Sequence, residues 1–189
     1  MSSHSYEIAL FGEFLKGDLK PVLNRVALHS ESAHQMHSYE VIFDPPDAAA
    51  QREANQEPAL LRAKKELLEP DAKWLLYSYW KPESARIHPE ATVRPWATVQ
   101  VVGDALGFAS ALGYIKRSPI CRRGYIFRRG KLTIQIFQEE QVDAKTQEPI
   151  PAHADTLWQV IVKTANPVRG TQEVQALMKG LIDLRRQDV

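Results

Sequence analysis

The sequence of 189 residues contains a single cysteine, Cys121, so it can form neither an internal disulfide nor a cysteine-rich zinc site. No run approaches the ~18 consecutive apolar residues that a membrane-spanning helix needs. The first residues lack the basic segment and long apolar core of a secretory signal. We therefore expect a reducing compartment, cytosol or nucleus, and no membrane partner.

A large excess of charge of either sign is also lacking, since 24 basic and 23 acidic residues leave a formal net charge of +1. Nucleic-acid-binding domains are usually far more basic, so direct binding to nucleic acid is not expected. Any affinity for phosphate must come from a local patch. The length and the 44% hydrophobic content indicate one globular domain spanning residues 1–189.

Catalytic and cofactor motifs are absent as well. The chain has no G-x-S-x-G, no phosphate-binding lysine loop and no G-x-G-x-x-G. His29, His34 and His37 lie close in sequence, but their spacing is not that of a helical zinc motif, and we interpret them as solvated loop residues. Cys121 has no histidine near it in sequence to act as a base. We predict no catalytic residue, no metal, no cofactor and no enzymatic activity.

Alternation of polar and apolar residues predicts about eight strands without a strand–helix–strand rhythm. Short helices are expected after Asp18 and Asp104, and an amphipathic helix at about residues 171–186. The proline-bounded segment 44–58 is predicted to be a flexible loop. The predicted fold is mainly β with flanking helices: an antiparallel closed barrel of about eight strands, because closure removes exposed edges.

The stretch RRGYIFRRGKLTIQIFQEEQ, from Arg122 to Gln141, reads as a hairpin that turns at Arg129–Gly130. Alternation groups its apolar residues on one face, which we expect to be the barrel interior. The arginines are then expected at a rim, facing an acidic protein surface. The apolar residues are Tyr125, Phe127, Leu132, Ile134 and Ile136, and the arginines are Arg122, Arg123, Arg128 and Arg129.

The stretch WLLYSYW, which ends at Trp80, has two apolar faces, so a strand there must be covered on both sides. Its outer face needs either the C-terminal helix of the chain or another protein. We predict that Trp74, Tyr77, Tyr79 and Trp80 contribute to a partner interface.

Two alternatives remain open. The first is a tunnel barrel that binds phosphate or polyphosphate, as triphosphatases do; it requires inward-facing arginines with a carboxylate pair nearby. Tunnel triphosphatases place metal-binding carboxylates at i and i+2 of a strand, but this sequence has no E-x-E, and Glu139 and Glu140 are adjacent. The second is an RNA-binding barrel that combines the basic residues with Tyr125 and Phe127.

The chain resembles subunit 18 of the Mediator complex of RNA polymerase II transcription, in particular its fungal forms. The resemblance rests on the order of several segments and covers nearly the whole chain. These are YEIALFGEF, LNRVALHSES, SYEVIFDP, LLRAKKEL, VRPWATVQVVGDALGFASALGYI and RRGYIFRRGKLTIQIFQ. The segments Asp44–Pro58 and Asp143–His153 are shorter than in the longer members of the family.

This resemblance implies a barrel related in shape to tunnel RNA triphosphatases, in a nuclear protein of the Mediator head module without catalytic activity. It also implies a heterodimer with the similar barrel of subunit 20 and a tether through a C-terminal helix of subunit 8. Contacts with other head-module subunits and the polymerase machinery would make the protein a coactivator that links regulators to RNA polymerase II.

Overall fold

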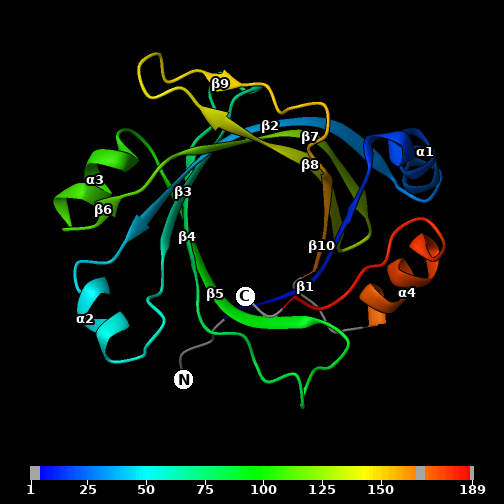
Figure 1. The fold of residues 1–189 in the computed structure, drawn as a ribbon, viewed down its shortest axis with the longest axis horizontal. Helices are drawn as coiled ribbons and strands as arrows, with labels where there is room; N and C mark the ends of the chain where they lie inside the picture. The colour runs from blue at the N-terminus through cyan, green and yellow to red at the C-terminus, as the bar shows by residue number, and fades with distance from the viewer. Residues whose placement is uncertain (1–4, 165–168, 188–189) are drawn as a thin grey trace.

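The computed structural model describes residues 5–164 and 169–187. In this part of the chain, eight antiparallel strands form a closed barrel in the order β10-β1-β5-β4-β3-β2-β7-β8, and β8 pairs with β10 to complete the ring (Figure 1). The barrel strands are β1 (Ser5–Phe14), β2 (Ser32–Asp44), β3 (Leu61–Glu66), β4 (Trp74–Tyr79), β5 (Thr92–Val101), β7 (Ile120–Arg129), β8 (Leu132–Val142) and β10 (Trp158–Thr164). The predicted fold class is confirmed.

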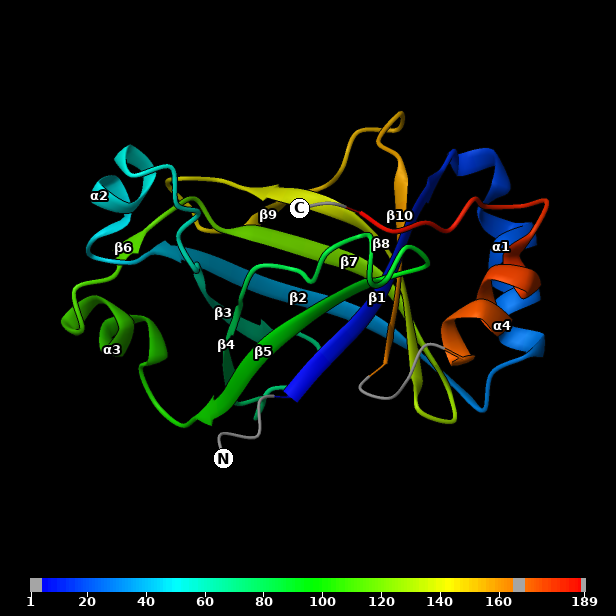
Figure 2. The same cartoon turned by 90° about the horizontal axis from the view of Figure 1, so that it is seen from below.

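The helices and two short strands lie outside this ring, as the side view in Figure 2 also shows. A 3-10 turn (Lys16–Asp18) leads into α1, in which Asp18 occupies the N-cap position without a side-chain hydrogen bond. The Asp104 carboxylate does cap α3, accepting a hydrogen bond of 2.8 Å from the Gly107 N–H. The remaining elements are α1 (Leu19–Leu28), α2 (Ala48–Glu53), α3 (Ala105–Ala111), α4 (Arg169–Met178), β6 (Ile115–Lys116) and β9 (Pro149–Ile150).

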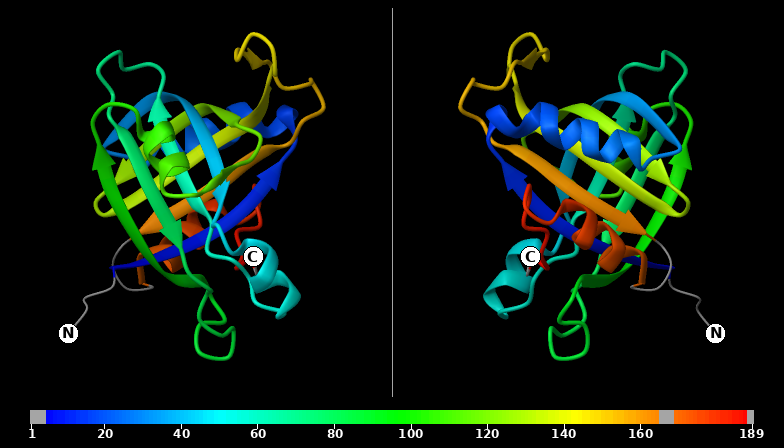
Figure 3. Two further views of the ribbon diagram at one scale, coloured as in Figure 1. Left: turned by 90° about the vertical axis from the view of Figure 1, so that its left-hand side faces the viewer. Right: turned by 90° about the vertical axis from the view of Figure 1, so that its right-hand side faces the viewer.

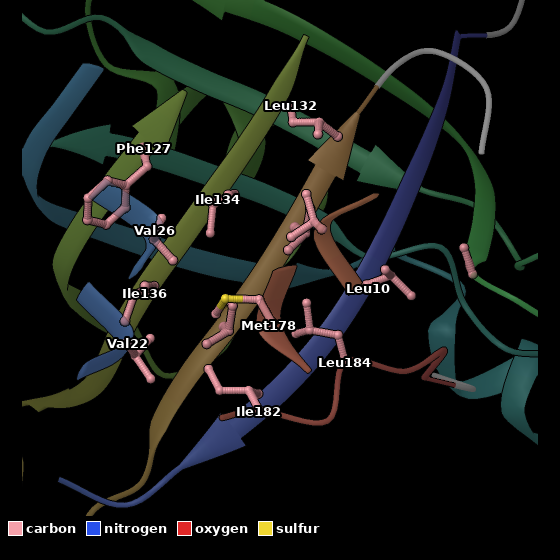
Figure 4. Close-up of a cluster of buried hydrophobic side chains, with 14 of the residues drawn as sticks. Leu10, Val22, Val26, Phe127, Leu132, Ile134, Ile136, Met178, Ile182 and Leu184 are labelled. Carbon is pink, nitrogen blue, oxygen red and sulfur yellow. The ribbon is translucent and has the colours of Figure 1, made fainter. Parts of the chain in front are cut away.

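The main hydrophobic core lies between the outer wall of the barrel and the pair α1 and α4 (Figures 3 and 4). Val22 and Val26, four residues apart on α1, present one buried apolar face to it, and Val174 and Met178 do the same on α4. The strands contribute their outward residues, among them Leu10, Phe127, Leu132, Ile134, Ile136, Val160 and Val162.

The main core lies outside the barrel, so the expected orientation of the hairpin β7–β8 was wrong. Alternation sorts its residues correctly into two faces, but the apolar face is the outer one. Phe127, Leu132, Ile134 and Ile136 pack in the main core, and Tyr125 lies against it, stacked on Trp158. The register joins Arg129 to Leu132, so Gly130 and Lys131 make the turn, with Gly130 at a φ of 53°.

A second core lies on the opposite side of the barrel, beneath α3. Leu76 of β4 and Phe43 of β2 are buried there together with Ala105 and Ala109 of α3, and Trp74 packs edge-on against Tyr39. The outer face of β4 is thus covered by α3 and not by the C-terminal helix, which contacts α1, β1 and β10 instead.

The C-terminal helix α4 ends at Met178, whereas the sequence predicts a helix that continues to about residue 186. Gly180 takes a φ of 84°, a backbone conformation that stops a helix. The chain then runs extended beside β1, where Phe11 and Arg185 exchange two backbone hydrogen bonds of 2.9 Å. Ile182 and Leu184 complete the main core from this segment.

The proline-bounded segment 44–58 contains the short helix α2, whose Ala48 is buried. Its Arg52 forms an ion pair with Asp44, which Arg117 also contacts at 2.7 Å. Among the described residues, no helix has both the length and the apolar character that crossing a membrane requires.

Candidate functional site

The inner face of the barrel carries charged and polar side chains together with aromatic ones and Leu75, because the more apolar face of each strand packs outward. On β7, Arg122 and Arg128 line an interior cavity, whereas Phe127 lies in the outer core. On β4, Leu75, Tyr77 and Tyr79 line the same cavity, and Leu76 faces α3. Alternation at a period of two residues therefore separates a charged interior from an apolar exterior.

Glu40 of β2 is at the centre of one interior ion-pair network. Its fully buried carboxylate accepts a hydrogen bond of 2.7 Å from Arg62 and one of 3.1 Å from Arg122. Arg122 also donates to Glu139, at 3.0 Å, and lies over the ring of Phe137. Each strand contributes one partner, so the network links the four neighbouring strands β3, β2, β7 and β8 along one side of the barrel wall.

Glu7 of β1 holds a second network. Its carboxylate accepts a hydrogen bond of 2.9 Å from Arg94 and pairs with Lys163 at 3.1 Å. The hydroxyl of Tyr79 donates to Glu7 at 2.9 Å, and the guanidinium of Arg94 lies 3.5 Å from the centre of the Tyr79 ring. The strands β1, β4, β5 and β10 are joined in this way.

Burial and charge shift the pKa values of these groups in opposing directions. Burial alone would raise the pKa of Glu7, but Lys163 and Arg94 outweigh it, so this carboxyl has a pKa below its ordinary value. Glu40 behaves likewise, because Arg122 and Arg62 outweigh the effect of its burial on the pKa. Burial raises the pKa of Tyr77 and Tyr79, and neighbouring carboxylates raise it further. The two glutamates are therefore ionised and both phenols are neutral at physiological pH.

Two cavities open from the interior. The larger, of about 450 Å³, extends from Arg128 and Lys131 beside the β7–β8 turn to Arg122 and Tyr79. The smaller, of about 250 Å³, is lined by the chain before β3 and after β4, together with Arg62 and Arg94. Tyr79 lines both cavities, so it forms part of the wall between them.

The outer surface of β7 and β8 carries a smaller polar cluster. Glu140 accepts a hydrogen bond of 2.8 Å from Arg123, and its other oxygen lies 3.3 Å from Nε2 of His37. Cys121 is buried beside this cluster, and burial, with a further contribution from Glu140, raises its pKa to about 11. The thiol is protonated at neutral pH and is a poor nucleophile.

The residues predicted for a partner interface fall into different environments. Tyr77, Tyr79 and Arg122 lie inside the barrel, and Arg128 is exposed at the mouth of the larger cavity. Trp74 is half-buried beneath α3. Trp80 is exposed and the side chain of Arg123 is 58% exposed, so both are accessible to a partner. Arg129 is half-buried and already interacts with another part of the protein.

Sequence reasoning missed Glu7, Glu40, Lys64 and Lys163, which help to form the charged interior. For Glu7, Glu40 and Lys163 the signal was a charged residue within a run of mostly apolar strand residues, whereas β3, which carries Lys64, is mostly charged and gives no such contrast. Inward-facing arginines with carboxylates nearby are the arrangement that the polyphosphate-binding alternative requires. Among the described residues, however, His, Cys, Asp and Glu form no group of three that could hold a metal ion.

Comparison with known proteins gives a match in structure alone. No family model matches the sequence, and no curated protein matches it. A chain of the Schizosaccharomyces pombe Mediator head module superposes with a TM-score of 0.77 at 15% identity, over 97% of this chain and 100% of that one.

Two other solved structures show how widely the fold occurs. A conserved hypothetical protein from Pyrococcus furiosus gives a TM-score of 0.60 at 15% identity, over 95% of this chain and 94% of that one. The RNA triphosphatase domain of a mimivirus mRNA capping enzyme gives 0.51 at 8% identity, over 94% and 88%. At these identities the likeness establishes a shared barrel fold.

Proposed function

We propose that this protein is a nuclear subunit of a Mediator head module, in the position of subunit 18, where it acts as a non-enzymatic adaptor. One observation carries the proposal: the similarity to the S. pombe head-module chain extends over 97% of this chain and all of that one, at a TM-score of 0.77. The barrel of the mimivirus triphosphatase domain is more distant, at 0.51. The order of the sequence segments supports the same assignment independently.

The chemistry of the interior supports a role without catalysis. Glu7, Glu40 and Glu139 are each held in ion pairs with arginine or lysine, so they are not free to act together as metal ligands or as a general base. The thiol of Cys121 is buried and protonated.

An adaptor must present surface to its partners, and α3 does so. Phe108 lies on this helix and Leu112 is its C-cap residue four positions later, and the two residues are 52% and 55% exposed. Val102 before the helix and Ile115 after it are exposed as well. Neighbouring exposed apolar side chains are typical of protein–protein contact sites. We expect subunit 20 or the C-terminal helix of subunit 8 to cover this surface in the assembled module.

The proposal is tested by purifying the chain alone and together with subunits 20 and 8 of the same organism. We expect the three proteins to elute as one complex in size-exclusion chromatography, with a higher melting temperature than the single chain. A chain that remains monomeric and gains no stability from either partner would refute the proposal.

A substitution that introduces a charge on the α3 surface tests whether the partner subunits bind there. Phe108→Glu should weaken the complex at least tenfold, or about 1.4 kcal/mol, while the isolated chain keeps its melting temperature because the side chain is exposed. Leu28→Glu is the matched control, since Leu28 is an exposed apolar residue on the other side of the barrel, at the end of α1. Equal effects of the two changes would count against α3 as the interface.

A further inference from the structure

The larger interior cavity carries a strong excess of positive charge. Its basic residues span β3, β7, β10 and the β7–β8 turn, and Glu7 is the acidic residue among those that line it. The basic lining residues are Lys64, Arg122, Arg128, Lys131 and Lys163. The chain as a whole is close to neutral, so this charge is concentrated in the cavity by the fold.

Only part of this charge is neutralised within the protein. Arg122 is paired with Glu40 and Glu139, and Lys163 is paired with Glu7. For Lys64, Arg128 and Lys131, the described part of the chain provides no direct ion pair or side-chain hydrogen bond. Lys64, Arg128 and Lys131 thus line one cavity without a direct anionic partner among the residues that the structure describes.

Lys64 shows that this arrangement has an energetic cost. Burial lowers the pKa of its ammonium group, and repulsion from Arg122 and Lys163 lowers it further, against the attraction of Glu40 and Glu66. A fold that had no use for this charge would be more stable with an apolar or neutral side chain at the position. A bound anion would remove the cost.

The size and shape of the cavity restrict the anion. About 450 Å³ lies in the range of small-molecule sites, ~300–1,000 Å³, and the walls are the strands of a closed barrel. A peptide would need an open groove along the surface. Arg128 and Lys131 are exposed at the mouth and Lys64 is half-buried further inside, so the positive charge is spread along the depth of the cavity. Thr133 and Gln135 add neutral hydrogen-bond donors.

We propose that this cavity binds a chain of linked phosphates, which enters past Arg128 and Lys131 and reaches Lys64. The ligand is either inorganic triphosphate or the triphosphate arm of a nucleotide, which share the same chemistry. Lysine and arginine are the usual partners of phosphate oxygens. The site binds without hydrolysing, because the interior carboxylates are already engaged by cations. This inference is independent of the proposed place in a head module.

The test measures binding of sodium triphosphate to the whole chain by calorimetry and by thermal melting, in buffer of low ionic strength with a metal chelator. We expect saturable binding with one ligand per chain and a higher melting temperature. Sulfate at matched ionic strength should give a much smaller shift. ATP is the second probe: tighter binding of triphosphate indicates a free polyphosphate, and tighter binding of ATP a nucleotide.

Variants identify the site. Lys64→Gln, and separately the double change Arg128→Gln with Lys131→Gln, should weaken triphosphate binding about tenfold or more, since each removes charge that contacts the ligand. Without ligand, Lys64→Gln should melt at the same or a higher temperature than the unchanged protein, which separates loss of binding from loss of folding. Lys65→Gln is the matched control, because Lys65 follows on the same strand and belongs to the opposite face.

Several results would overturn the proposal. One is the absence of saturable binding of triphosphate, and another is an equal response to sulfate at the same ionic strength. An equal loss of binding in Lys64→Gln and Lys65→Gln would place the anion elsewhere. Binding of ATP but not of triphosphate would show that the nucleoside is recognised. Binding of an acidic peptide in place of triphosphate would assign the cavity to a protein partner.

Discussion

Glu7 is the residue on which one half of the barrel interior depends. It is 6% exposed, and it neutralises Arg94 and Lys163 while accepting a hydrogen bond from Tyr79. Removing one member of a buried ion-pair network leaves the opposite charges without compensation, which is more costly than the network is worth. Even the conservative substitution Glu7→Gln should therefore lower the free energy of unfolding strongly.

We expect Glu7→Gln to lower the free energy of unfolding by about 3–5 kcal/mol at neutral pH. The amide keeps the shape of the side chain but leaves the charges of Arg94 and Lys163 facing each other. Urea denaturation followed by circular dichroism measures the change. Glu13→Gln, on an exposed position of the same strand, should alter the free energy by less than about 0.5 kcal/mol.

The pH dependence of stability follows from the same carboxyl groups. The pKa values of Glu7 and Glu40 lie below their ordinary value of 4.5, so the folded state binds fewer protons than the unfolded state. Their stabilising effect is complete above about pH 4.5 and is lost as the pH falls through the folded-state pKa. Melting temperatures should therefore fall steeply below that pH. In Glu7→Gln the fall should be shallower, and parallel curves for the two proteins would contradict this account.

At the scale of elements, the C-terminal segment is fitted closely to β1. A side chain on Gly12 would place its Cβ 2.7 Å from Ile182 and 2.9 Å from Leu184, which is too close for contact. Arg186 further fixes the segment by donating hydrogen bonds to the carbonyl groups of Glu83 and His88. The glycine thus permits the segment to lie against the strand.

Gly12→Val should displace residues 182–187 and destabilise the protein by about 1–3 kcal/mol. Hydrogen exchange should show faster exchange at Arg185, whose N–H donates to Phe11. Gly17→Ala is the control, because a Cβ there meets nothing within 4 Å. Unchanged protection at Arg185 in Gly12→Val would mean that the segment adapts without leaving the strand.

The elements also show which part of the structure a single sequence reveals. Alternation placed Phe127 and Arg128 of β7 on opposite faces correctly, whereas the segment of β3, LRAKKE, does not alternate and was read as a strand from its short length and its neighbours. Alternation cannot tell which face is the interior of a closed ring, because both a filled barrel and a barrel covered by helices give the same period. The deciding facts, that α1 and α4 cover one side and α3 another, are long-range contacts. The candidate site was missed for this reason.

At the scale of the whole molecule, the apolar core surrounds the barrel instead of filling it. Outside the ion-pair networks, stability should then depend more on contacts between the wall and the helices than on the neutral side chains that line the interior cavity. Met178 of α4 is fully buried in the main core, whereas Gln135 of β8 lines the cavity.

Met178→Ala should lower the free energy of unfolding by about 2–5 kcal/mol, as expected for a buried side chain that leaves a void. Gln135→Ala should cost less than about 1 kcal/mol, because the side chain adjoins an existing cavity. Both values come from the same denaturation experiment. If Gln135→Ala were the more damaging change, the interior of the barrel would be the structural core.

The ring also has a consequence for how the protein folds. The gap between β8 and β1 is filled by β10, the last of the barrel strands among the described residues, which pairs with both. β10 follows both β1 and β8 in the chain, so each of these two strands has one unpaired edge until β10 is present. Such edges attract strands of other chains, and barrels that close through distant segments fold slowly, in about milliseconds to seconds. The two edges of β1 and β8 are therefore protected only once β10 has taken its place between them.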